Sequence, residues 1–110
     1  MEMNELLEFI SEQDTKLTAV NSTARPSERI LALMVKLTEE TGELADEVLA
    51  SQGDQRKEKL SEMSTDGLEN EVADVIITVL LLAAALNVDV SAALQKKIEK
   101  IRKRTYEHGR

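Results

Sequence analysis

Residues 69–86 read ENEVADVIITVLLLAAAL, an acidic start followed by an apolar run that dictates how the rest of the chain has to pack. Glu71 and Asp74 are three residues apart, so a helix places both carboxylates on nearly the same face. The run from Val75 to Leu86 is interrupted only by Thr78 and is apolar on every side. It is shorter than the roughly 20 residues needed to span a bilayer, so it predicts a central core helix and no membrane segment.

A second acidic pair, Glu40 and Glu43, has the same spacing in the segment that begins at Pro26. Proline suits the first turn of a helix, and we expect this helix to run to about Ala50. Residues spaced alternately by four and three positions share one stripe of a helix. The stripe that contains Glu40 consists of Leu33, Leu37, Glu40, Leu44 and Glu47. Glu40 therefore lies on the apolar face of the predicted helix and not on its solvent face.

The remaining sequence predicts two further helices and one polar connection. An amphipathic helix opens the chain around Leu6, Leu7 and Ile10, and residues 51–67 form a connection with one helical turn at 58–63, able to act as a lid. Asn87 suits the end of the core helix. Asp89 or Ser91 suits the start of a last helix.

These elements predict an all-α fold, an antiparallel helical bundle of three to four main helices in a single domain, residues 1–110. A core helix that is apolar all round needs more cover than so few helices provide. We therefore expect a homo-oligomer, either a homodimer or a homotetramer.

Charge and composition exclude several classes of function. With 14 basic and 21 acidic residues the net charge is −7, which argues against binding nucleic acid. The chain has no cysteine, which excludes disulfides and thiolate chemistry. The first residues, MEMNELLEF, lack the basic start of a signal peptide, so we expect a cytoplasmic protein.

Glu40 lies on an apolar stripe and Asp74 has apolar residues on both sides, so we expect both carboxylates to be buried and to need a positive partner. An acidic helix is usually a solvated face, but a carboxylate taken out of water without a partner costs several kcal/mol. Lys36 lies one turn before Glu40, and no basic residue falls between Gly67 and Gln95. A divalent cation satisfies all the acids at once, and oxygen ligands favour Mg²⁺, with Mn²⁺ as a substitute. The predicted metal ligands are Glu40, Glu43, Glu71 and Asp74.

The same residues carry a resemblance to a known family. The segments LTEETGEL, residues 37–44, and ENEVADV, residues 69–75, resemble the signature of the MazG-like all-α nucleoside triphosphate pyrophosphohydrolases: Glu-x-x-Glu, a variable insert, and Glu-x-x-Asp. The resemblance covers about residues 26–106, and the combined motif is far more specific than either half. It implies that the acids bind Mg²⁺, which holds a triphosphate while water attacks the α-phosphorus, releasing a nucleoside monophosphate and pyrophosphate.

The resemblance also implies roles for neighbouring residues. Glu39 is the candidate to orient or deprotonate the attacking water. A basic segment follows the second acidic motif, and there Lys97, Lys100 and Arg104 share one face of the last helix and can reach the phosphates. Lys36 is a further candidate for binding substrate. By analogy with small members of the family, deoxynucleotides are the expected substrates and clearing the dNTP pool the expected role.

Two other functions compete with this prediction. A di-iron carboxylate bundle needs Glu-x-x-His on two helices, and the single histidine, His108, cannot supply it. A catalytically silent helical module that binds a regulatory partner is consistent with the sequence and stays open.

Overall fold

A computed structural model of the chain describes residues 1–21, 23–53 and 65–108, and within these ranges the side chains of 65–66 and 105–108 are not described. The predicted helical turn at 58–63 and the proposed lid lie outside the described residues. The helices are α1 (Met3–Val20), α2 (Pro26–Ser51), α4 (Thr65–Ala85) and α5 (Val90–His108). All regular structure in the described residues is helical, as the sequence predicted.

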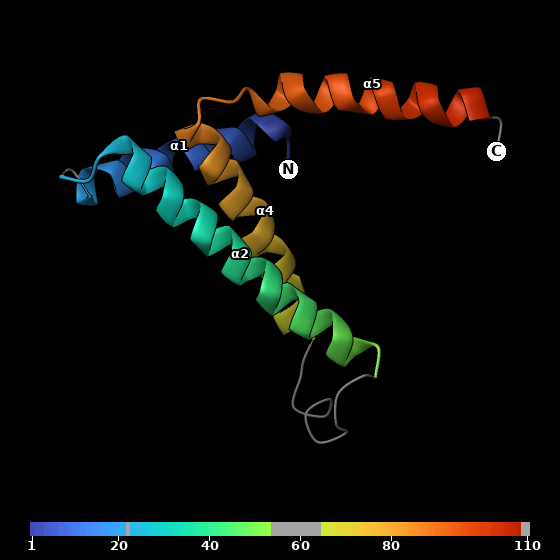
Figure 1. Cartoon of the computed structure of the whole chain (residues 1–110), viewed down its shortest axis with the longest axis horizontal. Helices are drawn as coiled ribbons and strands as arrows, with labels where there is room; N and C mark the ends of the chain where they lie inside the picture. Colours follow the sequence, from blue (N-terminus) through green and yellow to red (C-terminus); the bar gives the residue numbers. More distant parts are fainter. Residues whose placement is uncertain (22, 54–64, 109–110) are drawn as a thin grey trace.

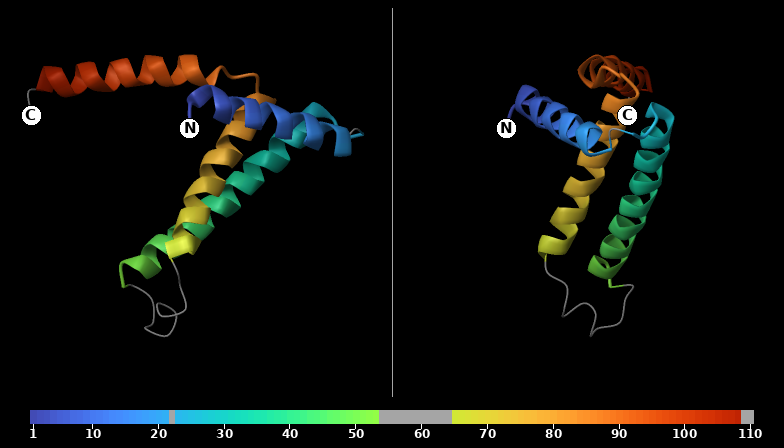
Figure 2. Two further views of the ribbon diagram at one scale, coloured as in Figure 1. Left: turned by 180° about the vertical axis from the view of Figure 1, so that it is seen from behind. Right: turned by 90° about the vertical axis from the view of Figure 1, so that its left-hand side faces the viewer.

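The frame of the molecule is the pair α2 and α4, which lie side by side and run in opposite directions (Figures 1 and 2). Helix α1 crosses the upper end of this pair and packs on α4. The core at the crossing consists of Ile10 from α1 and Leu80 and Leu81 from α4, with Leu33 of α2 packed against them. Burial at this end fixes the angle between α1 and the α2–α4 pair.

The apolar stripe predicted on α2 is confirmed. Every residue of the stripe, Leu33, Leu37, Glu40, Leu44 and Glu47, is half-buried. This is the face that α2 turns towards the interior, so Glu40 enters the contact between α2 and α4 with the leucines.

The turn between α4 and α5 follows the predicted chemistry. Asn87 has φ 57°, the left-handed conformation that ends many helices, and the amide of Val88 reaches back to the carbonyl of Ala83 at 2.9 Å. A carboxylate oxygen of Asp89 accepts a hydrogen bond from the amide of Ala92 at 3.0 Å. Asp89, and not Ser91, therefore caps the start of α5.

Helix α5 departs from the predicted bundle. Its direction turns by 114° from that of α4, and it projects away from the other helices (Figure 1). Among the described side chains of α5, Val90 at its start packs against the cluster around Ile10 and Leu81. The bundle in the described chain is thus formed by α1, α2 and α4.

No single helix in the described ranges is long and apolar enough to cross a membrane, although residues 67–85 and 90–104, taken together as a bent pair, pass on length and composition alone.

Candidate metal and nucleotide site

Three carboxylates from two helices converge at the middle of the α2–α4 contact. Glu40 and Glu43 come from successive turns of α2, and Glu71 comes from the first half of α4. Each offers a carboxylate oxygen, and the three oxygens lie within 4.8 Å of one another. The predicted pairing of acids across two helices is therefore found for these three residues.

Two of these carboxylates have a buried oxygen with nothing to bind. Oε2 of Glu40 and Oε2 of Glu71 are buried and have no hydrogen-bond partner among the described residues. The other oxygen of Glu40 lies 3.6 Å from Nζ of Lys36, whose side chain is 56 % exposed. An exposed lysine at that distance compensates one carboxylate weakly and leaves the cluster with excess negative charge.

The cluster shifts the protonation of Glu71. The pKa of Glu71 is raised from its ordinary 4.5 to about 7, first by burial and then by the adjacent carboxyls of Glu40 and Glu43, which share a proton with it and repel its negative charge. Below about pH 7 the metal-free cluster therefore holds a proton on Glu71. Three convergent carboxylates, two with buried free oxygens, match the oxygen ligands of a hard divalent cation such as Mg²⁺.

Asp74 and Glu39 lie outside this group. Asp74 is exposed, although its sequence neighbours are apolar, because residues one or two positions away on a helix point to other faces and do not cover it. The expectation of a buried Asp74 was wrong for that reason. Asp74 remains one turn from Glu71 on α4, and Glu39 is an exposed residue four positions before Glu43, so both border the cluster.

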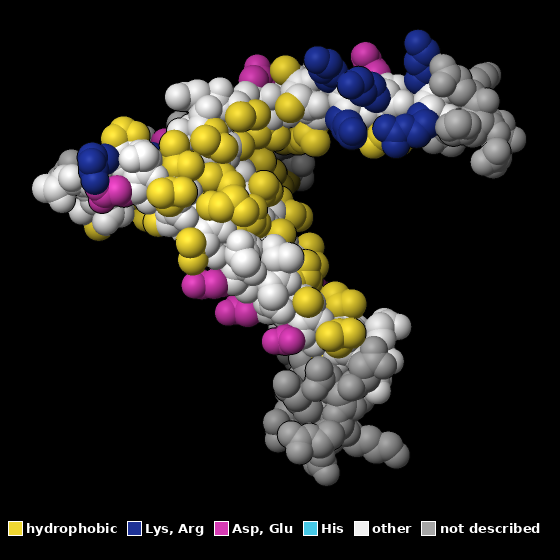
Figure 3. All heavy atoms as spheres, in the orientation of Figure 1, with side chains coloured by type: hydrophobic (Ala, Val, Ile, Leu, Met, Phe, Trp, Pro, Cys, Tyr) yellow, Lys and Arg dark blue, Asp and Glu magenta, His cyan; other side chains and the backbone are white. Residues whose placement is uncertain are grey.

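The predicted phosphate-binding residues of α5 do not reach the cluster of their own chain. Figure 3 shows basic side chains gathered along α5 and acidic ones along the lower half of the molecule. Glu71 is 14 residues from the end of α4 and Arg104 is 14 residues from the start of α5. At 1.5 Å per residue and with a 114° turn between the helices, the two are on the order of 20 Å apart. Lys97 and Lys100 lie on the same exposed helix.

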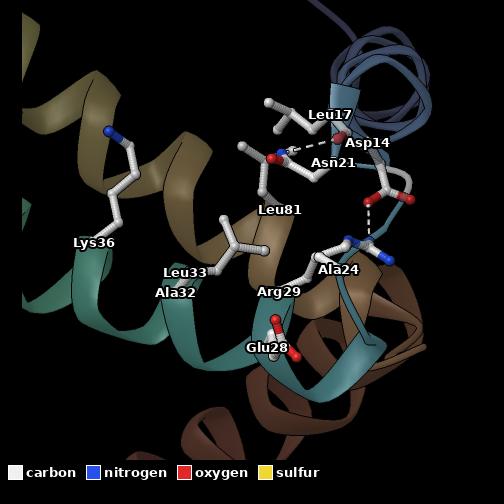
Figure 4. A pocket seen from close by; sticks show the side chains of 10 residues that line it. All are labelled: Asp14, Leu17, Asn21, Ala24, Glu28, Arg29, Ala32, Leu33, Lys36 and Leu81. Carbon is white, nitrogen blue, oxygen red and sulfur yellow. Dashed lines mark hydrogen bonds and ion pairs between the residues drawn. The ribbon is translucent and has the colours of Figure 1, made fainter. Parts of the chain in front are cut away.

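A pocket of about 490 Å³ lies between α1 and α2, directly beyond Lys36 (Figure 4). Its apolar lining includes Leu17, Leu33 and Leu81, and the ion pair between Arg29 and Asp14, 3.1 Å long, closes one side. The other lining residues are Asn21, Ala24, Glu28, Ala32 and Lys36.

Sequence reasoning missed this pocket, although α2 carries a signal for it. Arg29, Ala32, Leu33 and Lys36 follow the spacing i, i+3, i+4, i+7 and so share one face of the helix. The face continues into Glu40, so the pocket and the carboxylate cluster are neighbours along α2. A pocket with a largely apolar lining and a few polar groups is typical of a small-molecule site.

Comparison with known proteins identifies the family. The model of the MazG nucleotide pyrophosphohydrolase domain matches residues 28–108. The chain belongs to this family. Over 74 residues it is also 35 % identical to the uncharacterized protein YpjD of Bacillus subtilis strain 168, a match that spans 67 % of this chain and 65 % of that protein.

The MazG match includes all three clustered glutamates and α5, but it begins after α1. The carboxylate cluster therefore lies wholly within the family domain. The pocket combines family residues of α2 and α4 with Asp14, Leu17, Asn21 and Ala24, which precede the matched range.

The raised pKa of Glu71 predicts how the stability of the metal-free protein changes with pH. The unfolded chain loses this proton near pH 4.5 and the folded chain only near pH 7. The contribution of Glu71 to the free energy of unfolding is thus fully present below pH 4.5 and is lost as the pH rises through 7. Urea denaturation with a chelator, at about pH 5, 6, 7 and 8, measures this change. As the pH rises, the wild type should lose stability relative to Glu71→Gln.

The control for this experiment is Glu69→Gln, which neutralises an exposed acid on the same helix. It should leave the pH dependence of the wild type unchanged. A Glu71→Gln curve parallel to that of the wild type would show that Glu71 has an ordinary pKa.

Proposed function

We propose that the protein is a Mg²⁺-dependent nucleoside triphosphate pyrophosphohydrolase that converts a (d)NTP and water into a (d)NMP and pyrophosphate. Its role is to clear deoxynucleotides from the nucleotide pool. The observation that carries the proposal is the cluster of Glu40, Glu43 and Glu71 with its two buried, unsatisfied oxygens, found in a chain of the MazG family.

The residues present fit a magnesium ion. Glu40, Glu43 and Glu71 would hold it, and Asp74, one turn further along α4, is the proposed fourth ligand; Mn²⁺ offers the same oxygen preference. When bound, the ion neutralises negative charge on the phosphate oxygens of the substrate. The chain itself contributes a fixed frame, since the ligands come from two packed helices and are not carried by loops.

Glu39 is proposed to handle the proton of the attacking water. It is exposed, and it borders the cluster through its position four residues before Glu43. The oxygen of the water adds to the α-phosphorus and the bond from that phosphorus to the α–β bridging oxygen breaks. The water's proton passes to the Glu39 carboxylate, and pyrophosphate leaves with the bridging oxygen.

The pocket is proposed to hold the nucleoside. Its rim residue Lys36 already contacts Glu40, so a phosphate chain leaving the cluster passes Lys36 before the sugar and base enter the space beside Leu33. A volume of about 490 Å³ lies within the range of small-molecule sites. Lys36 would then exchange its contact with Glu40 for one with a phosphate oxygen.

Filling this pocket should weaken substrate binding. Ala32→Phe adds a ring to a lining residue, and we expect KM to rise roughly 10-fold with a smaller fall in kcat, because binding is lost while the carboxylate cluster is kept. Steady-state kinetics with each dNTP measures the two constants separately. Leu31→Phe is the control, since Leu31 is 65 % exposed and does not line the pocket. Equal KM values for the two variants would place the nucleoside elsewhere.

The function itself is tested by incubating the purified chain with each dNTP and NTP and Mg²⁺. We expect pyrophosphate and the monophosphate, and no orthophosphate. Orthophosphate as the primary product would mean cleavage at the γ-phosphate. No turnover of any nucleotide would favour the silent interaction module.

A further inference from the structure

The pocket between α1 and α2 has a basic residue at each end. Lys36 lies at the rim beside the carboxylate cluster, and Arg29 lies seven residues earlier on the same face of α2. Seven residues of an α-helix extend about 10 Å, a distance comparable with the length of a nucleoside. A substrate whose phosphates pass Lys36 therefore brings its base to Arg29.

At this far end Arg29 of α2 is paired with Asp14 of α1. Nη2 of Arg29 donates a hydrogen bond to Oδ1 of Asp14 at 3.1 Å, and the two side chains are only 21 % and 32 % exposed. Figure 4 shows the pair at the end of the pocket away from Lys36. A guanidinium has five N–H donors and a carboxylate has two acceptor oxygens, so this single contact leaves both groups able to bind a ligand.

The pair presents acceptors of one kind beside donors of one kind, because a carboxylate only accepts and a guanidinium only donates. The hydrogen-bonding edge of guanine is a carbonyl followed by two N–H donors, and that of cytosine is an amino donor followed by two acceptors. Each of these edges can match the pair with three hydrogen bonds. Uracil and thymine alternate carbonyl, N–H and carbonyl, so one of their carbonyl oxygens has to face the carboxylate. Adenine offers one donor and one acceptor, and therefore makes fewer hydrogen bonds with the pair.

We propose that Asp14 and Arg29 recognise the base of the substrate and favour guanine and cytosine nucleotides over those of uracil, thymine and adenine. The proposal rests on the proposed function, because it takes the nucleoside to lie in this pocket. Selection follows because a mismatched edge leaves a polar group unpaired at a site largely removed from water.

The other lining residues do not distinguish the bases in this way. Leu17, Leu33 and Leu81 provide apolar contacts that any base can make. The side-chain amide of Asn21 donates to the carbonyl of Leu17 at 3.1 Å, which ties Asn21 to the end of α1. Choice of the base therefore depends on the link between α1 and α2, whereas the three clustered carboxylates lie on α2 and α4.

A comparison of dCTP with dUTP tests the proposal, because the two differ only in the order of donors and acceptors on the base. In the wild type, kcat/KM for dCTP should exceed that for dUTP by roughly 10-fold or more. Asp14→Asn should reverse this preference. The asparagine side chain carries one acceptor and one donor, so beside Arg29 it matches the alternating edge of uracil. Steady-state kinetics with both nucleotides measures the ratio.

The matched control is Glu12→Gln, because Glu12 is an exposed acid of α1 that does not line the pocket. This variant should keep the wild-type ratio. If the ion pair only holds α1 against α2, Asp14→Asn lowers kcat/KM for both nucleotides by the same factor. An unchanged ratio in Asp14→Asn would therefore overturn the proposal, as would equal kcat/KM for dCTP and dUTP in the wild type.

Arg29→Lys gives a second variant, which keeps the charge that pairs with Asp14. Lysine lacks the planar fork of arginine that binds two neighbouring acceptors. Cytosine needs that fork, whereas the carbonyl of guanine needs one donor. We expect kcat/KM to fall roughly 10-fold for dCTP and clearly less for dGTP. An equal fall for both nucleotides would contradict the assigned contact between Arg29 and the base.

Binding of monophosphates separates this proposal from the proposed function. Neither dCMP nor dUMP can release pyrophosphate, so calorimetry measures their dissociation constants whether or not the protein is an enzyme. We expect dCMP to bind more tightly than dUMP, and Asp14→Asn to remove the difference. A wild type that keeps this difference but hydrolyses no triphosphate would refute the proposed function and support the base recognition. Hydrolysis of triphosphates with equal affinity for the two monophosphates would refute the base recognition alone.

Discussion

Replacing Glu40 by glutamine (Glu40→Gln) should lower kcat by roughly 150-fold or more, since a loss of about 3 kcal/mol of charge stabilisation in the transition state corresponds to that factor. Glu40 lies in the α2–α4 contact, with a side chain only 14 % exposed and one oxygen without a partner among the described residues. Glutamine keeps the shape of the side chain but removes the charge that holds a cation. The measurement is steady-state release of pyrophosphate at saturating Mg²⁺.

The fold should survive this substitution. The carboxylates of the metal-free cluster repel one another, as the raised pKa of Glu71 indicates. Removing one charge therefore reduces the repulsion between α2 and α4. The lost contact with the exposed Lys36 is worth at most about 1 kcal/mol. Glu47→Gln is the matched control because Glu47 is half-buried on the same stripe of α2, two turns further on. It should keep nearly full activity. An active Glu40→Gln enzyme would remove Glu40 from the site.

Much of the fold follows from local patterns that packing does not override. The period of Leu33, Leu37, Glu40 and Leu44 determines which face of α2 is buried, and the structure buries that face. The helix ends around Asn87 and Asp89 follow from the left-handed conformation of one residue and the capping carboxylate of the other. These features depend on residues close in sequence, so the sequence alone predicts them.

Other features depend on faces that the sequence does not distinguish. Helix α4 is apolar all round, so its sequence pattern does not predict which face is buried. In the structure Thr78 is 3 % exposed, whereas its neighbour Val79 is 42 % exposed. For the same reason the exposure of Asp74 was mispredicted. The direction of α5 and the pocket between α1 and α2 depend on contacts between segments distant in sequence. Those contacts form in the core around Ile10 and Leu81, where different helices pack together. The spacing of residues within one helix does not predict them.

Magnesium should stabilise the wild-type protein strongly at pH 8 in the absence of any nucleotide. At this pH Glu71 has lost its proton, because its pKa is about 7. A cation then binds only the folded arrangement, since the unfolded chain does not bring α2 and α4 together. At a Mg²⁺ concentration 100 times the dissociation constant, the free energy of unfolding should rise by about 2.7 kcal/mol. Urea denaturation with and without Mg²⁺ measures the increment.

The increment should be lost in Glu43→Gln, which removes one of the three convergent carboxylates. It should be kept in Asp46→Asn, which neutralises an exposed acid one turn further along α2. At pH 5 the increment should shrink in the wild type as well, because Glu71 holds a proton there and the cation has to displace it. Equal stabilisation of both variants by Mg²⁺ would show that the ion binds general surface charge. Because no substrate takes part, the outcome judges the metal site separately from catalysis, and a stabilised protein without turnover would be a metal-binding helical module.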